Sequence, residues 1–223
     1  MCGRYSLSQK LPKIEARFGA QASFEQLPRR YNIAPTHNAP VVLNRVPEVL
    51  QLLKWGFPMP RNDSKVVFNA RSETVTEKRM FKAAFVEARC LVPFDGYYEW
   101  KFQGRGGKQP YRITLPQQEL AAFAGVWKTH PESEEKYFSI LTKAAPKALQ
   151  NIHSRVPVIV PQVLEKHWLQ LDTNAENILN EILRYQPEDF VFYPVSKQVN
   201  NVRNEAPELT EPHGGVQTDL FGS

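Results

Sequence analysis

Eighteen prolines are spread along the 223 residues of the chain. A proline lacks the amide hydrogen and has a fixed φ angle, so it interrupts both helix interiors and central strands. This distribution favours many short strands joined by irregular loops. Hydrophobic residues make up 42% of the sequence, enough for a sizeable core in one large domain or two small ones. No internal repeat or low-complexity block is present, and the sequence indicates a mixed α+β fold.

Hydrophobic periodicity places the elements along the chain. Apolar residues at helical spacing predict helices over residues 10–19, 72–90, 161–171 and 174–185. Apolar and alternating segments predict strands over residues 41–46, 49–57, 90–102, 110–116, 123–127, 137–142 and 189–196. The glycine-rich segment 103–109 is typical of a hairpin connection. In the predicted helix 72–90 we expect Ser72 as the N-cap and one apolar stripe, formed by Met80, Phe81, Phe85 and Val86.

Composition excludes several classes of protein. No apolar run approaches the roughly 18 residues of a membrane-spanning helix, and the N-terminus lacks an apolar signal-peptide core, so we expect a cytoplasmic protein. Cys2 and Cys90 form no CxxC pair and the five histidines are scattered singly, so we expect no disulfide, metal or cofactor. The net charge of +5 fits a polyanion such as nucleic acid, although it also fits a solvated surface.

Two segments near the start of the chain combine polar groups that a core would not need. In MCGR, removal of Met1 would leave Cys2 with a free α-amine and a thiol on adjacent carbons. In FNARSET, Asn69 and Arg71 are two positions apart, so in an extended segment they share a face. The alternative is that Arg71 pairs with a nearby glutamate at a helix start.

Two further segments carry groups that suit proton transfer. In GYYEWK, strand alternation puts Glu99 on the same side as Tyr97 and opposite to Tyr98 and Trp100. A carboxylate among aromatic rings is either paired or has a raised pKa, which suits a general acid or base, but a surface glutamate is the alternative. In NIHSR, His153 lies near Arg155, although a lone histidine is often structural.

Taken together, the motifs identify a family. MCGRY, RYNIAPT, WGF, NARSET, RMFK, RCLVPFDGYYEW, KQPY, LT, IHSRVPVI and VNN occur in this order. From Cys2 to about Asn204 the sequence resembles the SOS-response-associated peptidase (SRAP) family of abasic-site-processing proteins. The resemblance implies a single compact α+β domain over residues 2–209, with a mostly antiparallel, barrel-like sheet and flanking helices. It also implies a basic groove for single-stranded DNA, lyase-type crosslinking to abasic sites in the DNA damage (SOS) response, and a nucleoid-associated location.

The resemblance assigns roles to individual residues. Cys2 becomes the crosslinking residue, Asn69 the group that orients it, and Glu99 and His153 the acid–base pair. Contacts to phosphate or DNA backbone are implied for Arg4, Arg71, Thr142 and Arg155. The stretch WGFPMPRNDSK departs from the family, whose members commonly have a proline- and tryptophan-rich stretch there. Phe57 and Met59 are the remaining candidates for a wedge against the DNA bases.

The chemistry explains why the cysteine must be terminal. An abasic sugar opens to an aldehyde, and aldehydes condense with uncharged amines. A terminal α-amine has a pKa of about 7.7–8.0, against about 10.4 for lysine, so more of it is reactive at neutral pH. The thiol of the same residue can then close a five-membered thiazolidine, which resists hydrolysis better than an open imine.

Two other functions remain open at this point. One is an N-terminal-nucleophile amidotransferase or peptidase, in which the terminal amine serves as base for the thiol. Because the family name contains the word peptidase, autoproteolytic removal of Met1 belongs to this alternative. The other is a non-covalent single-strand-binding module in which Cys2 is incidental.

The segment 210–223 is polar and aperiodic, and we expect a flexible tail. Its end, QTDLF, resembles the short peptides by which bacterial repair proteins and polymerases bind the replication sliding clamp. On that pattern Gln217 would hydrogen-bond at the rim of the clamp pocket, while Leu220 and Phe221 would fill it. The alternative is that both apolar side chains fold back onto the domain.

Overall fold

The computed structural model describes residues 2–60, 62–172, 174–185, 187 and 190–213. Within these residues the α-helices are α1 (Leu11–Phe18), α2 (Lys82–Glu87), α3 (Glu165–Leu169) and α4 (Ala175–Arg184). The strands are β1 (Tyr5–Leu7), β2 (Gln21–Ala22), β3 (Arg30–Ile33), β4 (Asn38–Leu43), β5 (Val46–Trp55), β6 (Phe57–Met59), β7 (Asn62–Val67), β8 (Asn69–Arg71), β9 (Arg89–Phe94), β10 (Gly96–Phe102), β11 (Lys108–Thr114), β12 (Ala121–Thr129), β13 (Lys136–Ala144), β14 (Arg155–Pro157), β15 (Ile159–Val160) and β16 (Val191–Pro194).

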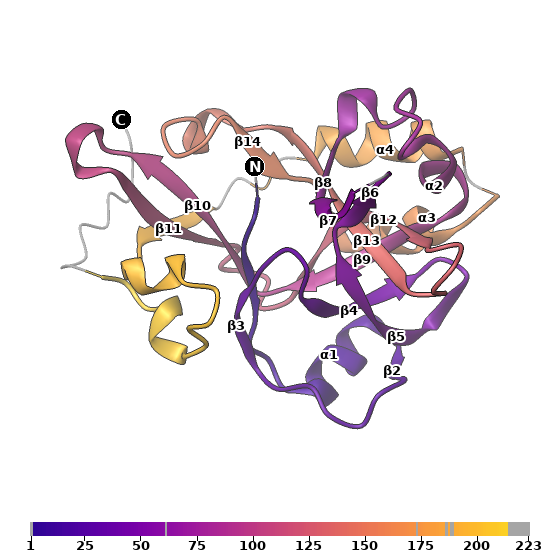
Figure 1. Ribbon diagram of the computed structural model, residues 1–223, viewed down its shortest axis with the longest axis horizontal. Helices are drawn as coiled ribbons and strands as arrows, with labels where there is room; N and C mark the ends of the chain where they lie inside the picture. Colours follow the sequence, from indigo (N-terminus) through magenta and orange to yellow (C-terminus); the bar gives the residue numbers. More distant parts are fainter. Residues whose placement is uncertain (1, 61, 173, 186, 188–189, 214–223) are drawn as a thin grey trace.

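The larger sheet closes on itself (Figure 1). Strand β5 pairs with β4, β4 with β9, β9 with β12 and β12 with β13, all antiparallel, and β13 returns to β5 in a parallel pairing. This ring has no open edge between its members. Strands β9 and β12 approach closely at Gly125, where a Cβ atom would lie 2.7 Å from the Cys90 sulfur. The predicted α+β domain with a mostly antiparallel, barrel-like sheet and flanking helices is therefore confirmed.

A second sheet, in the order β16-β11-β10-β1-β3, packs on this ring. Phe123 of β12 stacks on Phe94 with ring centroids 3.7 Å apart, and it contacts Tyr5 and Tyr97 of the second sheet edge to face. The chain crosses between the sheets at Asp95. Its carboxylate accepts hydrogen bonds from serine hydroxyls and pairs with the Arg112 guanidinium at 3.2 Å, which fixes this corner.

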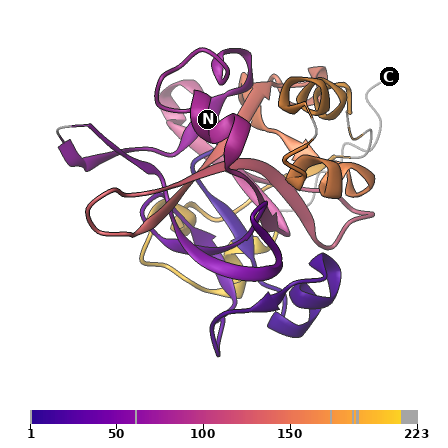
Figure 2. The same ribbon diagram turned by 90° about the vertical axis from the view of Figure 1, so that its right-hand side faces the viewer.

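The helices lie around the outside of the strands (Figure 2). None of them, in the described part of the chain, has the length and apolar character that crossing a membrane requires. The predicted helices 10–19 and 174–185 are confirmed as α1 and α4. The predicted helix 161–171 is confirmed as a 3-10 turn over Gln162–Leu164 that leads into α3.

The prediction of one continuous helix over residues 72–90 is wrong. The segment forms a 3-10 turn over Ser72–Thr74, irregular turns and then the short α2. Arg71, rather than Ser72, is the N-cap residue of this turn, and Ser72 is buried within it. β-Branched residues in the sequence Thr-Val-Thr disfavour helix here, and buried Val75 fixes the turn in the core. Of the predicted apolar stripe, Phe81 and Phe85 are buried, whereas Val86 is exposed.

The last described segment covers the outer face of the second sheet, near Tyr98. Two 3-10 turns, over Lys197–Asn200 and Pro207–Thr210, bury Val199 and Leu209 against it. The His213 amide donates to the Pro194 carbonyl, so contacts with the domain continue past residue 209. The predicted clamp-binding residues Gln217, Leu220 and Phe221 lie outside the described residues.

Candidate active site

Cys2 is part of the hydrophobic core. It lies three residues before Tyr5, the first residue of β1, and β1 pairs with β10 on one side and β3 on the other, so two ladders fix the start of the chain. Cys2 is fully buried, and Asn69 Nδ2 donates to its carbonyl oxygen at 2.7 Å. Asn69 is positioned by the pairing of β8 with β13. Burial raises the pKa of the Cys2 thiol, and the negative charge of Glu99 raises it further, so the thiol is protonated at neutral pH.

Glu99 faces inward from β10. The side chain is only 2% exposed, which excludes a surface glutamate, and burial raises its pKa to about 7. The predicted alternation of β10 is borne out by Tyr98, whose hydroxyl donates to the Tyr31 carbonyl in the cluster on the other face. A carboxyl group with a pKa near 7 can both give and take a proton under physiological conditions.

His153 lies next to Glu99 although the two come from distant parts of the chain. Its Nδ1 is 4.0 Å from Glu99 Oε2 and accepts a hydrogen bond from the Arg155 amide at 3.0 Å. Burial lowers the pKa of His153, and positive charges including those of Lys108 and Arg155 lower it further. The imidazole is therefore neutral at pH 7, and the contact is suited to proton exchange rather than to a permanent ion pair.

Arg155 and Thr142 form a second group beside this pair. The Arg155 guanidinium donates to the carbonyl of buried Thr142 at 2.7 Å and to both carboxylate oxygens of Glu73 at 2.9 and 3.0 Å. Glu73 thus binds Arg155, whereas Arg71 is exposed on β8. The structure places Arg71, Thr142 and Arg155 around the same strands, β8, β13 and β14, with Arg71 opposite Thr142 in register.

Arg4 points away from Cys2 into a buried network. Its Nη1 donates to Asn32 Oδ1 at 2.6 Å and to the Val199 carbonyl at 2.5 Å, and the guanidinium lies 5.7 Å from the centroid of the Trp100 ring. Asn32 was not singled out from the sequence. It is fully buried and its amide also donates to Asn201 and Asn204, so the RYN and VNN motifs meet here. The role of Arg4 as a DNA contact remains a prediction.

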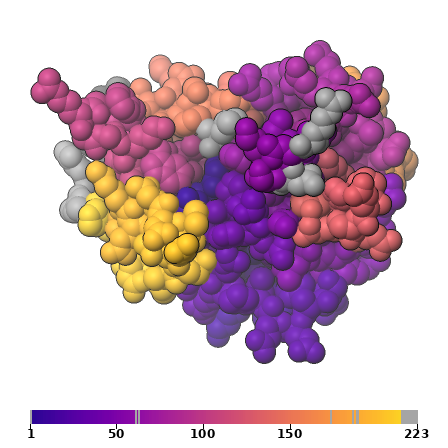
Figure 3. Space-filling view, in the orientation of Figure 1, coloured from indigo at the N-terminus to yellow at the C-terminus, as the bar shows by residue number. Residues whose placement is uncertain are grey.

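The start of the chain is visible at the bottom of a surface depression (Figure 3). The depression lies between the hairpin of β10 and β11, the segment around β14 and the yellow C-terminal segment. Of the two wedge candidates, Phe57 is fully buried against Phe81, with ring centroids 5.6 Å apart. Met59 is 38% exposed, so it is the one that could contact DNA bases.

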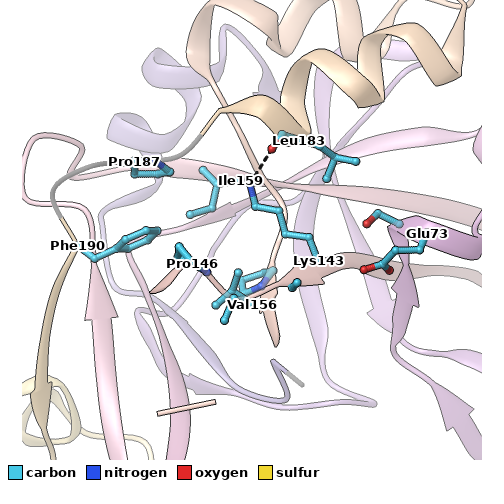
Figure 4. A pocket seen from close by; sticks show the side chains of 12 residues that line it. Glu73, Lys143, Pro146, Val156, Ile159, Leu183, Pro187 and Phe190 are labelled. Atoms are coloured by element: carbon cyan, nitrogen blue, oxygen red, sulfur yellow. Dashed lines mark hydrogen bonds between the residues drawn. The ribbon is translucent and has the colours of Figure 1, made fainter. Parts of the chain in front are cut away.

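A separate cavity of about 350 Å³ adjoins the Arg155–Glu73 pair through Glu73 (Figure 4). Its walls are mostly apolar and include Pro146, Val156 and Phe190. The Lys143 ammonium donates to the carbonyls of Leu183 and Tyr185 at the end of α4. Neither Cys2 nor Glu99 lines this cavity, so its position does not identify the reactive site.

The described residues contain no group of three histidine, cysteine or acidic side chains that could hold a metal ion. The chemistry that these residues themselves offer is nucleophilic and acid–base. A buried cysteine near the start of the chain lies beside a carboxyl group that titrates near neutrality and a neutral imidazole. This is the arrangement that a covalent reaction at a carbonyl carbon needs.

The chain is similar in sequence to several known proteins. The chain is 36% identical to the abasic site processing protein YoqW of Bacillus subtilis, over 96% of this chain and the whole of that protein. It is 30% identical to the abasic site processing protein YedK of Escherichia coli, over 95% of this chain and all of that one. The rat abasic site processing protein HMCES is 30% identical over 82% of this chain and 64% of its own length.

The fold also recurs among solved structures. A crystal structure of a protein from Bacteroides thetaiotaomicron superposes with a TM-score of 0.83 at 23% identity, and it covers 95% of this chain and all of that one. The family model described as "SOS response associated peptidase (SRAP)" matches residues 1–202, nearly the whole described domain. The chain therefore belongs to the SOS response associated peptidase (SRAP) family.

Proposed function

We propose that this protein processes abasic sites in single-stranded DNA by forming a covalent crosslink through Cys2 after Met1 is removed. The observation that carries the proposal is the juxtaposition of buried Cys2, whose carbonyl is held by Asn69, with the Glu99–His153 pair. The relatives YoqW, YedK and HMCES are named abasic site processing proteins, which supports an abasic site as the substrate. Such a crosslink would shield the lesion during the DNA damage (SOS) response.

The reaction joins two nucleophiles to one carbon. The uncharged α-amine of Cys2 adds to the aldehyde carbon, and the resulting hydroxyl leaves as water after it receives a proton from Glu99. The thiol then adds to the carbon of the protonated C=N bond, its proton returns to the Glu99 carboxylate, and a thiazolidine results with the loss of one water overall. Because the pKa of Glu99 is about 7, the same group can donate in the first step and accept in the second.

His153 acts on the sugar in this scheme. A neutral imidazole beside Glu99 can assist the opening of the sugar ring before the reaction, and it can assist the return to the aldehyde when the adduct is released. The arginines Arg71 and Arg155, with Thr142, hold the flanking phosphates. Cys2 has a small side chain that suits ordinary methionine excision, and autoproteolytic removal of Met1 is the second route to the same terminus.

The test is a stable adduct between the protein and a DNA strand with one abasic site, detected after denaturation. Cys2→Ala should abolish the adduct and leave affinity for intact DNA unchanged, and Cys2→Ser should give at best a labile product. Cys90→Ala is the matched control, because Cys90 is equally buried but lies on β9, and this variant should crosslink normally. A stable adduct from Cys2→Ala would refute the mechanism, and amide-bond cleavage without an adduct would favour an amidotransferase.

The end of the chain suggests where the protein acts. We propose that Gln217, Leu220 and Phe221 bind the replication sliding clamp, since QTDLF combines a leading glutamine with a terminal apolar pair. Tethering would raise the local concentration of the protein where polymerases stall. A peptide of residues 215–223 should bind the clamp, and Leu220→Ala with Phe221→Ala should eliminate binding without affecting crosslinking. Failure of both the peptide and the full chain to bind would retire the proposal.

A further inference from the structure

Several buried polar atoms around Cys2 have no hydrogen-bond partner among the described residues. They include the hydroxyls of Tyr5 and Tyr97 and the Oδ1 atom of Asn69, whose Nδ2 holds the Cys2 carbonyl. Other buried polar side chains vary: Arg89 donates to four backbone carbonyls, whereas Ser139 Oγ and the Nε atoms of Arg4 and Arg112 also have no partner among the described residues. A buried donor without a partner destabilises a fold, so such a group at a reactive site points to a ligand that supplies the partner.

Tyr97 is the phenol that lies with the reactive groups. It is on the same face of β10 as Glu99, two residues away, and it is directly opposite Tyr5 in the pairing of β10 with β1. Tyr97 is 1% exposed, so its hydroxyl is shielded from bulk solvent, as Cys2 is. Burial raises the pKa of Tyr97 well above its usual range, and the charges of Cys2 and Glu99 raise it further. The phenol is therefore a neutral donor at any physiological pH.

Neighbouring Tyr98 shows the contrast. Its side chain lies on the opposite face of β10 and its hydroxyl donates to the Tyr31 carbonyl at 2.8 Å. The two adjacent buried tyrosines therefore differ in their face of β10 and in their pairing: the hydroxyl of Tyr98 has a structural partner, whereas the hydroxyl of Tyr97 has none within the described part of the chain.

We propose that the Tyr97 hydroxyl donates a hydrogen bond to an oxygen of the opened abasic sugar while that sugar reacts at Cys2. The proposal rests on the proposed function, because it assigns a donor for that substrate. The group that fits is the hydroxyl formed when the Cys2 amine adds to the aldehyde. That oxygen gains a proton from Glu99, its bond to carbon breaks, and it leaves as water while the nitrogen lone pair forms the C=N bond. A donor at this oxygen stabilises it as it departs.

Tyr97→Phe removes only the hydroxyl. We expect it to maintain or raise the stability of the fold but to lower the rate of crosslinking. Its melting temperature should equal or exceed that of the wild type, because the variant no longer buries an unpaired donor. Its rate of crosslinking to abasic single-stranded DNA should fall about tenfold or more, whereas affinity for intact DNA should not change. The matched variant Tyr98→Phe should melt at a lower temperature and crosslink at the wild-type rate, because it loses a structural hydrogen bond.

The pH profile separates a direct donor from an effect on Glu99. Glu99→Gln should remove the inflection near pH 7, whereas Tyr97→Phe should keep that inflection and lower the rate by the same factor on both sides of it. Suppose that the wild-type protein forms the adduct. The donor role of Tyr97 is then overturned if Tyr97→Phe crosslinks at the wild-type rate, melts at a lower temperature than the wild type, or shifts the inflection. Absence of any adduct with the wild-type protein would overturn both this inference and the proposed function.

Discussion

At the scale of single residues, the chemistry depends on which face of its strand each side chain occupies. Although the sequence left a surface position open, the alternation of β10 was readable from it, so the location of Glu99 on the same face as Tyr97 could be predicted. Its distance of 4.0 Å from His153 could not, because it depends on how the loop before β14 packs against β10. The sequence likewise offered no signal that Glu73 would bind Arg155, since several glutamates follow NARS at similar spacing.

The raised pKa of Glu99 should make stability depend on pH. The ordinary pKa of 4.5 applies in the unfolded chain and about 7 in the folded one, so the folded state retains this proton more strongly. Below about pH 4.5 both states are protonated and no difference arises. As the pH rises toward 7 the unfolded state alone ionises, and folding becomes less favourable by an amount on the order of 3 kcal/mol, fully developed above pH 7.

Glu99→Gln lacks this ionisation. Its free energy of unfolding should therefore increase relative to that of the wild type as the pH rises from about 4.5 to about 7. Denaturant unfolding of both proteins across that range is the measurement. Two stability curves that stay parallel would show that Glu99 does not titrate with a raised pKa in the folded protein.

At the scale of elements, hairpins were easier to predict than helices. The glycines of segment 103–109 correctly indicated the connection of β10 and β11, where Gly104 and Gly107 adopt positive φ angles of 60° and 76°. The helix over 72–90 was overpredicted because most of its residues favour helix, whereas the β-branched Thr-Val-Thr sequence and the tertiary packing of Val75 and Phe81 select turns. Propensity is a weak guide where a few buried side chains decide the path of the chain.

Arg89 links the C-terminal ends of the two short helices α2 and α3. Its guanidinium is fully buried and donates to the carbonyls of Phe85 and Val86 at the end of α2 and of Trp168 and Gln170 at the end of α3. These carbonyls lack partners within their own helices. Arg89→Met should lower the free energy of unfolding by about 2–4 kcal/mol, because several buried acceptors lose their donor.

The measurement for Arg89→Met is chemical denaturation, with the adduct yield of the folded variant as the control. The yield should be unchanged, because Arg89 lies on β9 and contributes nothing to the group around Cys2. A variant as stable as the wild type would show that water replaces the guanidinium at these helix ends without loss.

At the scale of the whole molecule, the two ends of the described domain meet on the face of β10 opposite to Glu99. Arg4, next to the start of the chain, is bonded to Val199 in the last described segment, and Asn32 connects both. The family resemblance predicted which residues belong together, but only the packing of the segment around Val199 shows that Arg4 is buried. A sequence pattern marks an arginine as important without showing whether it faces DNA or protein.

Two of the three arginines of this resemblance, Arg4 and Arg71, should therefore behave differently. Arg71→Ala should weaken binding to intact and abasic single strands alike and flatten the slope of log affinity against log salt by about 0.7, because Arg71 is exposed. Arg4→Ala should in addition lower the melting temperature, since it breaks bonds to Asn32 and Val199. Binding isotherms at several salt concentrations, with thermal unfolding, test both. An unchanged slope for Arg71→Ala would place the DNA elsewhere.

The proposed crosslink through Cys2 is tested most directly by the mass of the adduct and its position in the chain. Wild-type protein is incubated with an abasic single strand without any reductant, denatured and analysed by intact-mass and peptide mass spectrometry. We expect one species with the mass of the protein lacking Met1, plus the DNA, minus one water, mapped to Cys2. An adduct on a lysine, an adduct on protein that retains Met1, or no adduct at all would contradict it.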